Sequence, residues 1–144
     1  MIRPYESRDF SDVAWLNSVS YSKPCTENEL RAKIDAGKCW VFEDSPIVVG
    51  ALITENRLSI DPYRPGFAFV WSVTVARNWQ RRGIGTALLN EASKTFPELW
   101  LHTEHFSDGE RLYTKLGWTP VKTEFDYYAP GIDAVLMVKR NVDV

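Results

Sequence analysis

The sequence lacks the long apolar segments and the cysteine motifs that would assign it to several large protein classes. No apolar run approaches the ~20 residues that a helix needs to cross a bilayer, and residues 1–6 lack the apolar segment of a signal peptide. The two cysteines, Cys25 and Cys39, form no C-x-x-C motif, and the only histidines, His102 and His105, have no cysteine partner. These absences predict a cytoplasmic protein that has no membrane anchor, redox pair or metal site.

The sequence also has no excess of positive charge. Its net charge is −2 and its pI is about 5.7, whereas proteins that bind nucleic acid usually have a basic face and a high pI. We therefore expect no nucleic-acid partner. The length of 144 residues, with 44% hydrophobic and 25% charged residues, suits a single globular domain over residues 1–144.

The most informative segment is a β-branched run that leads into two closely spaced glycines. Val73, Thr74 and Val75 are followed by Gln80–Gly85, which reads Gln-Arg-Arg-Gly-Ile-Gly, and a strong helical pattern starts there. Glycines let backbone N–H groups approach a ligand, and a helix start adds free N–H groups and the positive end of the helix dipole. The segment therefore predicts a site for a phosphate or pyrophosphate, although a plain glycine turn would read the same.

Two better-known phosphate loops do not fit this segment. The dinucleotide fingerprint G-x-G-x-x-G requires a third small residue, and that position holds Leu88. The nucleoside-triphosphate loop requires G-x-x-x-x-G-K-[ST], and the sequence contains no such run. The pattern that remains is Q-x-x-G-x-G between a strand and a helix.

This pattern resembles the acyl-CoA loop of the GCN5-related N-acetyltransferase (GNAT) superfamily, Q/R-x-x-G-x-G/A. A second segment, Leu112–Trp118, resembles the L-Y-x-K-x-G-F signature that closes the same domain. The start of the chain and residues 40–51 are similar to the family's first three strands and first helix. The resemblance covers essentially the whole chain and implies an α/β (α+β) fold, in which helices flank a mixed, mostly antiparallel sheet of about seven strands.

Hydrophobic periodicity and turn residues predict the positions of these elements. Helices are expected over residues 8–18, from Thr26 to Gly37, over 83–96 and from Ser107 to Gly117. Strands are expected over 39–43, 47–55, 67–75, 99–103, 121–128 and 134–140, and the strand over 67–75 should be central and buried on both faces. The resemblance adds a β-bulge in that strand, beside which the pantetheine arm of the cofactor would lie.

The resemblance implies acetyl-CoA as co-substrate and suggests which residues hold it. The backbone of Val73 and Val75 would pair with pantetheine, and the Gln80–Thr86 segment would bind the pyrophosphate. The complete predicted set is Val73, Thr74, Val75, Gln80, Arg81, Arg82, Gly83, Ile84, Gly85 and Thr86.

The reaction needs a group that protonates the leaving thiolate and a group that deprotonates the amine. By resemblance, Tyr113 is the general acid, although its helical pattern also suits a core tyrosine. His102 and Glu104 are the candidate bases, and His102 has the more suitable reference pKa, ~6.5. A half-buried structural histidine and a solvated strand-end glutamate are the alternatives to those two roles.

The acceptor remains open at the level of sequence. Aromatic side chains with one carboxylate suit an ammonium group, so the predicted pocket residues are Tyr21, Trp71, Asp126, Tyr127 and Tyr128. The favoured acceptor is a small-molecule primary amine; alternatives are a protein N-terminus or lysine, or a non-catalytic acyl-CoA sensor, and a homodimer is possible. Phe106, where the family often has Asn, and Gly109, where Ala is common, depart from the family pattern.

Overall fold

The computed structural model describes residues 1–55 and 67–140. The proline-containing loop expected at 56–66, one predicted wall of the acceptor pocket, lies outside these residues. One seven-stranded sheet runs through the described part, in the order β1-β2-β3-β4-β5-β7-β6. Its strands are β1 (Ile2–Pro4), β2 (Cys39–Asp44), β3 (Ile47–Glu55), β4 (Phe67–Val75), β5 (Glu98–Glu104), β6 (Thr119–Ala129) and β7 (Ile132–Arg140).

All neighbouring strands are antiparallel except β4 and β5, which are parallel. The helix between them, α3 (Ile84–Thr95), makes the crossover that the strand–helix–strand pattern predicted. The other helices are α1 (Phe10–Ser20), α2 (Glu27–Ala36) and α4 (Asp108–Lys115), with 3-10 turns η1 (Ser7–Asp9) and η2 (Arg77–Trp79). The mixed sheet with flanking helices confirms the predicted fold class.

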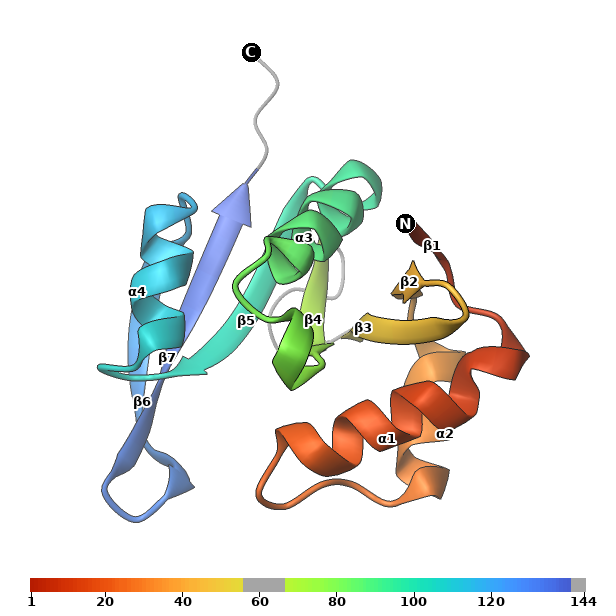
Figure 1. Cartoon of the computed structure of the whole chain (residues 1–144). Coiled ribbons are helices and arrows are strands. Elements are labelled where there is room, and N and C mark those ends of the chain that lie inside the picture. The colour runs from red at the N-terminus through yellow and green to blue at the C-terminus, as the bar shows by residue number, and fades with distance from the viewer. Residues whose placement is uncertain (56–66, 141–144) are drawn as a thin grey trace.

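The sheet has two arms, one formed by β1–β4 and the other by β5, β6 and β7. The helices divide between these arms. In Figure 1, α1 and α2 pack beside β3, α3 crosses the β2–β4 region, and α4 stands over β5 and β7. The large core cluster joins α1, α2 and α3 to β2–β4 and extends into β5 and β7, whereas five residues form a separate cluster beside it: Phe67, Phe69, Trp100, Leu136 and Val138.

Local signals place most helix ends as expected. The Thr26 hydroxyl accepts a hydrogen bond from the Glu29 N–H at 3.2 Å, and the Ser107 hydroxyl accepts one from the Glu110 N–H at 3.2 Å. Both are the predicted N-caps, and each satisfies an N–H group that the helix leaves unpaired.

The first helix begins later than the predicted residue 8, at Phe10. The cause is a tertiary ion pair: Arg3 donates two hydrogen bonds of 2.8 Å to Asp9 and one of 2.8 Å to Glu43. The Asp9 carboxylate also accepts a hydrogen bond from the Glu6 N–H at 2.8 Å. Residues 7–9 consequently form a 3-10 turn that ties β1 and β2 together.

None of the described helices has the length and apolar character that a bilayer span requires. Within residues 1–55 and 67–140, no group of three or more His, Cys, Asp or Glu side chains could hold a metal ion. Burial raises the pKa of the Cys25 thiol, and raises that of Cys39 to about 12, so both thiols stay protonated near neutral pH.

Candidate active site

The site begins where β4 and β5 separate. The two strands pair only from Phe67–Glu98 to Phe69–Trp100, so the rest of β4 has no strand on that side. β4 is central, as predicted, but its continuous burial ends after four residues. From there on the partly exposed Trp71, Val73 and Val75 alternate with buried residues. The prediction of burial on both faces is therefore wrong for the second half of β4, because that half borders a cleft.

A β-bulge marks the point of separation. Ser72 pairs with Ile53 of β3, whereas Val70 pairs with Thr54, so Trp71 is an extra residue in β4. The structure thus contains the bulge that the resemblance implied. Bulges bend a strand and interrupt its ladder, which here turns the second half of β4 away from β5.

The backbone of this second half is open toward the cleft. Ala76 donates its N–H to the Val49 carbonyl of β3 at 2.8 Å. Backbone groups alternate sides along an antiparallel strand, so those of Val75 and Val73 face the opposite side, where β5 no longer pairs. This edge could accept an extended ligand as an additional strand.

The glycine segment follows this open edge directly. Gln80 donates a hydrogen bond from Nε2 to the Val75 carbonyl at 3.0 Å, which ties the loop to the end of β4. Arg81 and Gly83 have left-handed backbones, with φ of 64° and 80°, a conformation that favours glycine. The chain then enters α3 at Ile84, whose first turn directs free N–H groups outward.

Gly85 has a different reason to be glycine. A Cβ atom built there would meet only Val75 Cγ2, at 3.8 Å, which is an ordinary contact. The folded chain alone does not require a glycine at this position. The missing side chain leaves space beside the helix start, where a bound phosphate would need it.

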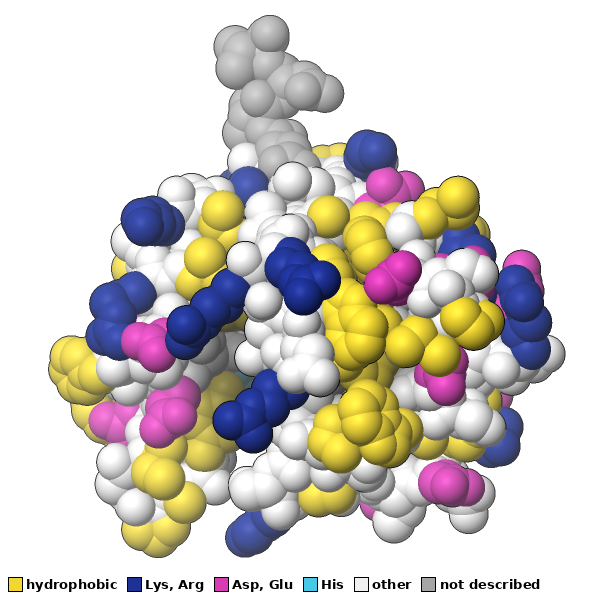
Figure 2. All heavy atoms as spheres, in the orientation of Figure 1, with side chains coloured by type: hydrophobic (Ala, Val, Ile, Leu, Met, Phe, Trp, Pro, Cys, Tyr) yellow, Lys and Arg dark blue, Asp and Glu magenta, His cyan; other side chains and the backbone are white. Residues whose placement is uncertain are grey.

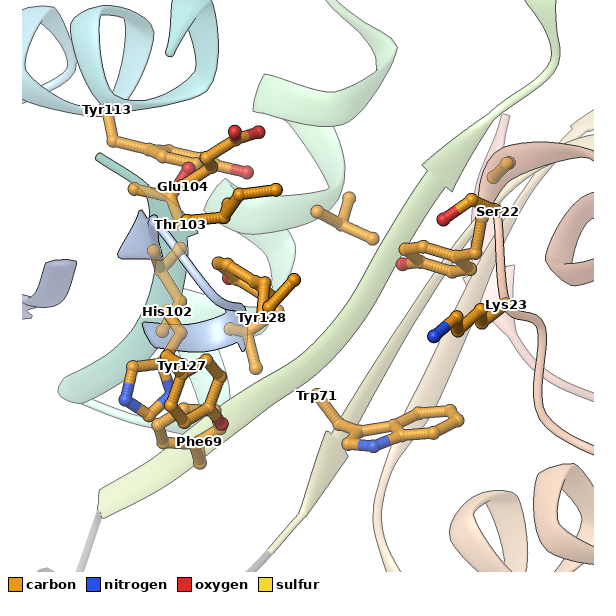
Figure 3. A pocket seen from close by; sticks show the side chains of 17 residues that line it. Ser22, Lys23, Phe69, Trp71, His102, Thr103, Glu104, Tyr113, Tyr127 and Tyr128 are labelled. Carbon is orange, nitrogen blue, oxygen red and sulfur yellow. The ribbon is translucent and has the colours of Figure 1, made fainter. Parts of the chain in front are cut away.

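A cavity of about 700 Å³ lies between the two arms. Its described walls come from the end of α1, the α1–α2 connection, β4, β5, α4 and the β6–β7 hairpin (Figure 3). A second cavity of about 630 Å³ shares Ser20, Tyr21 and Val73 with it and continues to Arg77 and Gln80. Figure 2 shows an apolar band on this face, with Lys and Arg side chains next to it. The hollow therefore runs from the glycine segment into the space between the arms.

Four tyrosines line the cavity: Tyr21, Tyr113, Tyr127 and Tyr128. Burial, and then proximity to Tyr21, raise the pKa of the Tyr113 phenol above its usual value. Burial, followed by the neighbouring Tyr127, Glu104, Tyr113 and Tyr21, raises the pKa of Tyr128 to about 12. The phenols of Tyr113 and Tyr128 are therefore protonated near neutral pH and can donate hydrogen bonds.

Four of the five predicted acceptor-pocket residues lie in the cavity walls: Tyr21, Trp71, Tyr127 and Tyr128. The Tyr21 hydroxyl is 2.7 Å from the Ser72 hydroxyl, which connects the end of α1 to the bulge. The Trp71 ring lies along the cavity floor beneath Lys23 in the view of Figure 3. Tyr128 meets Tyr127 edge to face, with ring centres 5.0 Å apart.

An irregular segment of β6 delivers Tyr127 and Tyr128 to the cavity. Glu124 pairs with Ala134 of β7, but the next pair is Ala129 with Ile132, so four residues of β6 stand opposite one of β7. Asp126, with φ of 54°, accepts a hydrogen bond from the Gly131 N–H at 2.7 Å. Asp126 is not among the described cavity-lining residues; its carboxylate instead holds the turn that presents the tyrosines.

The two candidate bases occupy different environments. The His102 side chain is 9% exposed, its Nε2 lies 2.8 Å from a Glu124 carboxylate oxygen, and its ring stacks on Tyr127 at 4.3 Å. Glu104 is exposed at the end of β5, and Figure 3 shows it beside Tyr113. Both line the cavity, but only Glu104 and Tyr113 lie together at its upper end in that view.

Sequence reasoning missed several lining residues, above all Phe69 and Lys23. It also missed Glu124, which borders the site through His102. Lys23 lies in an irregular connection with no motif, and Glu124 reads as a solvated strand charge. No local signal could have identified either residue, because their positions depend on distant strands.

The two departures from the family pattern have local explanations. Phe106 is 81% exposed, has a left-handed backbone with φ of 63° and stacks on His105 at 3.6 Å. A Cβ atom at Gly109 would lie 2.9 Å from Thr103 Oγ1, so a glycine lets α4 start close to β5.

Comparisons with known proteins agree with this architecture. The model of the acetyltransferase (GNAT) family matches residues 5–118. An N-alpha-acetyltransferase of Sulfurisphaera tokodaii is 40% identical over 75 residues, which are 47% of this chain and 45% of that protein. The match thus spans less than half of the length of that curated relative.

Solved structures share the fold at low identity. The ribosomal-protein-S18-alanine N-acetyltransferase of Escherichia coli has a TM-score of 0.84 at 20% identity, covering 100% of this chain and 95% of that chain. An aminoglycoside 6'-N-acetyltransferase complexed with coenzyme A has a TM-score of 0.84 at 13% identity, covering 100% and 98%. The family model matches most of the chain, and the chain has the fold expected for that family. This chain therefore belongs to the acetyltransferase (GNAT) family.

Proposed function

We propose that this protein is an N-acetyltransferase that transfers the acetyl group of acetyl-CoA to a primary amine, and that the amine belongs to a small molecule. The open edge of β4, which leads from the glycine segment into the cavity, carries this proposal. The related aminoglycoside acetyltransferase, crystallised with coenzyme A, supports both the cofactor and a small acceptor.

The cofactor would lie along backbone groups. The N–H groups of the first turn of α3, from Ile84 to Thr86, would bind the pyrophosphate, with Arg81 and Arg82 as cationic partners of its oxygens. The pantetheine arm would pair with the backbone of Val73 and with the N–H of Val75, whose carbonyl is held by Gln80. The thioester then reaches the cavity where the four tyrosines converge.

In the proposed reaction the neutral amine attacks the thioester carbonyl carbon and forms a tetrahedral intermediate. A backbone N–H near Val75 would stabilise its oxyanion, and such donors typically contribute a few kcal/mol. The carbon–sulfur bond then breaks, the amide forms, and the sulfur leaves with the bonding electron pair. One proton must leave the amine nitrogen, and one must reach the sulfur.

Tyr113 is the proposed general acid for the sulfur. Its phenol faces the cavity, and burial keeps it protonated by raising its pKa. Its ring packs against Trp118 at 5.7 Å, which fixes the direction in which the hydroxyl points.

Between the two candidate bases, the geometry supports Glu104. Glu104 lines the same cavity as Tyr113 and Tyr128, and Figure 3 shows it beside Tyr113. A carboxylate there can take the proton of the amine through a water molecule. His102 stacks on Tyr127 and is directed toward Glu124, so we assign it the role of positioning Tyr127 instead of acting as the base.

A second candidate acceptor is the α-amine of a protein N-terminus. The relative that is 40% identical over 75 residues is an N-alpha-acetyltransferase, and this observation favours that candidate. The cavity opens between the α1–α2 connection and the β6–β7 hairpin, so the chain of a peptide could continue outward.

The test is thiol release from acetyl-CoA in the presence of a panel of small amines and of peptides with free N-termini. We expect turnover with at least one primary amine and a mass increase of one acetyl group in the product. Turnover of peptides alone would replace the small-molecule proposal with the second candidate. Calorimetric binding of CoA without any acetylation would instead indicate a sensor domain.

A further inference from the structure

The cavity between the arms has charges of opposite sign on its two walls. Among its described lining residues, Lys23 is the cation on the α1–α2 side, and Glu104 is the carboxylate on the β5 side. In Figure 3 the Lys23 ammonium extends into the cavity from one wall, whereas Glu104 and Tyr113 occupy the other. Aromatic side chains, including Phe69 and Trp71, fill the floor between them.

Lys23 has no carboxylate partner within the described residues. The neighbouring Lys33 pairs with Glu55, and the carboxylate of Glu124 is engaged by His102 and Lys122. A lysine that projects into a partly apolar cavity without such a partner is free to neutralise an anion that enters with the acceptor.

The residues before Lys23 add further hydrogen-bond donors on the same wall. Ser20, Tyr21, Ser22 and Lys23 line the cavity consecutively, so two serines lie on the same wall as the ammonium. The connection from Tyr21 to Cys25 is not helical, so its N–H groups are not used in helical hydrogen bonds. Hydroxyl groups together with an ammonium are donors suited to a carboxylate or phosphate.

We propose that the acceptor is dipolar, with its amine directed to the Glu104 end of the cavity and an anionic group bound by Lys23 and the adjacent serines. This proposal rests on the acetyltransferase function proposed above and names the class of its substrate. A polycationic acceptor would place a positive group against Lys23 and is disfavoured by repulsion. An ω-amino acid, whose amine and carboxylate lie at opposite ends of the molecule, and a peptide with an acidic second residue both carry the required chemistry.

The experiment compares acceptors that differ only in charge. ε-Aminocaproate is paired with ε-aminocaproamide for the small-molecule source, and peptide amides that begin Ala-Glu are paired with those that begin Ala-Gln or Ala-Lys for the peptide source. We expect the wild-type protein to favour the anionic member of at least one pair. The pair that shows the preference identifies the source.

Three variants assign the preference to Lys23. Lys23→Met should reduce the anionic-to-neutral ratio of kcat/KM about fivefold, and Lys23→Glu should reverse it in favour of Ala-Lys. The change should appear mainly in KM, because the contact binds the substrate and its transition state equally. Lys38→Glu, an exposed charge reversal outside the cavity, should leave the ratio unchanged, and raised salt should reduce the wild-type preference.

The outcomes separate this inference from the function on which it rests. Equal turnover of both members of every pair by the wild type would support the acetyltransferase function and overturn the dipolar acceptor. An unchanged preference in Lys23→Glu, with a native melting temperature, would overturn the role of Lys23. Absence of thiol release with every acceptor would overturn both proposals.

Discussion

The two sides of the cleft differ in which groups line them: backbone groups line one side and side chains line the other. The side assigned to the cofactor is mainly backbone from one contiguous segment: the open edge of β4, the turn held by Gln80 and the first turn of α3. The side assigned to the acceptor is mainly side chains from the α1–α2 connection, β4, β5, α4 and the β6–β7 hairpin. A side-chain substitution should therefore affect the acceptor side strongly and the cofactor side weakly.

The difference suits the two tasks. A diphosphate and a pantetheine arm are the same in every turnover, so fixed N–H groups that require no particular side chain are sufficient. An acceptor must be distinguished from other amines, which requires side chains of particular shape and charge. The family can thus keep one cofactor geometry while the opposite wall varies.

The largest expected effect is the loss of one hydroxyl on the acceptor side. Tyr113→Phe keeps the ring that packs against Trp118 but removes the proposed donor to the sulfur, so kcat should fall by about 10²–10⁴-fold. Steady-state thiol release measures the effect. Calorimetry with CoA is the control, and its dissociation constant should not change; an unaltered kcat would remove Tyr113 from the mechanism.

The second effect separates the two candidate bases. Glu104→Gln should reduce kcat/KM by about 10²-fold, because an amide cannot take the proton of the amine. His102→Gln should cost less than about tenfold and should act by loosening Tyr127, with which the imidazole stacks. Kinetics of both variants over the same pH range decide between them: a larger loss in His102→Gln would assign the base to the histidine.

The third effect tests whether the cofactor side depends on space for backbone contact. Gly85→Leu should weaken CoA binding at least about tenfold, because its side chain fills the space beside the first N–H groups of α3. Gly85→Ala is the matched control and should bind nearly normally, because the acyl-CoA motif that this segment resembles admits alanine here and the added Cβ meets only Val75 Cγ2, at 3.8 Å, within the chain. Equal affinity of both variants would show that the diphosphate binds elsewhere.

The same contrast explains what the sequence could predict. β3 and β4 occupy the predicted residues 47–55 and 67–75, because strand positions depend on local patterns. The segment proposed to hold the cofactor could likewise be predicted from one local motif. Lys23 could not be assigned to the site because its position follows from how α1 packs on the sheet. Asp126 was predicted for the pocket together with Tyr128, but the irregular pairing of β6 breaks the alternation of side chains and turns the carboxylate to Gly131.

The smallest effect concerns the contact between α4 and β5, which supports Tyr113. Gly109→Ala should gain up to about 1 kcal/mol from helix propensity, but its Cβ would lie 2.9 Å from Thr103 Oγ1, a clash that offsets this gain. In a Thr103→Ala background the clash is absent, so Gly109→Ala should become stabilising by about 0.5–1 kcal/mol. Chemical denaturation of the four proteins of this cycle measures the coupling. The same change in unfolding free energy in both backgrounds would mean that Thr103 does not restrict residue 109, and that the glycine there serves the cleft instead.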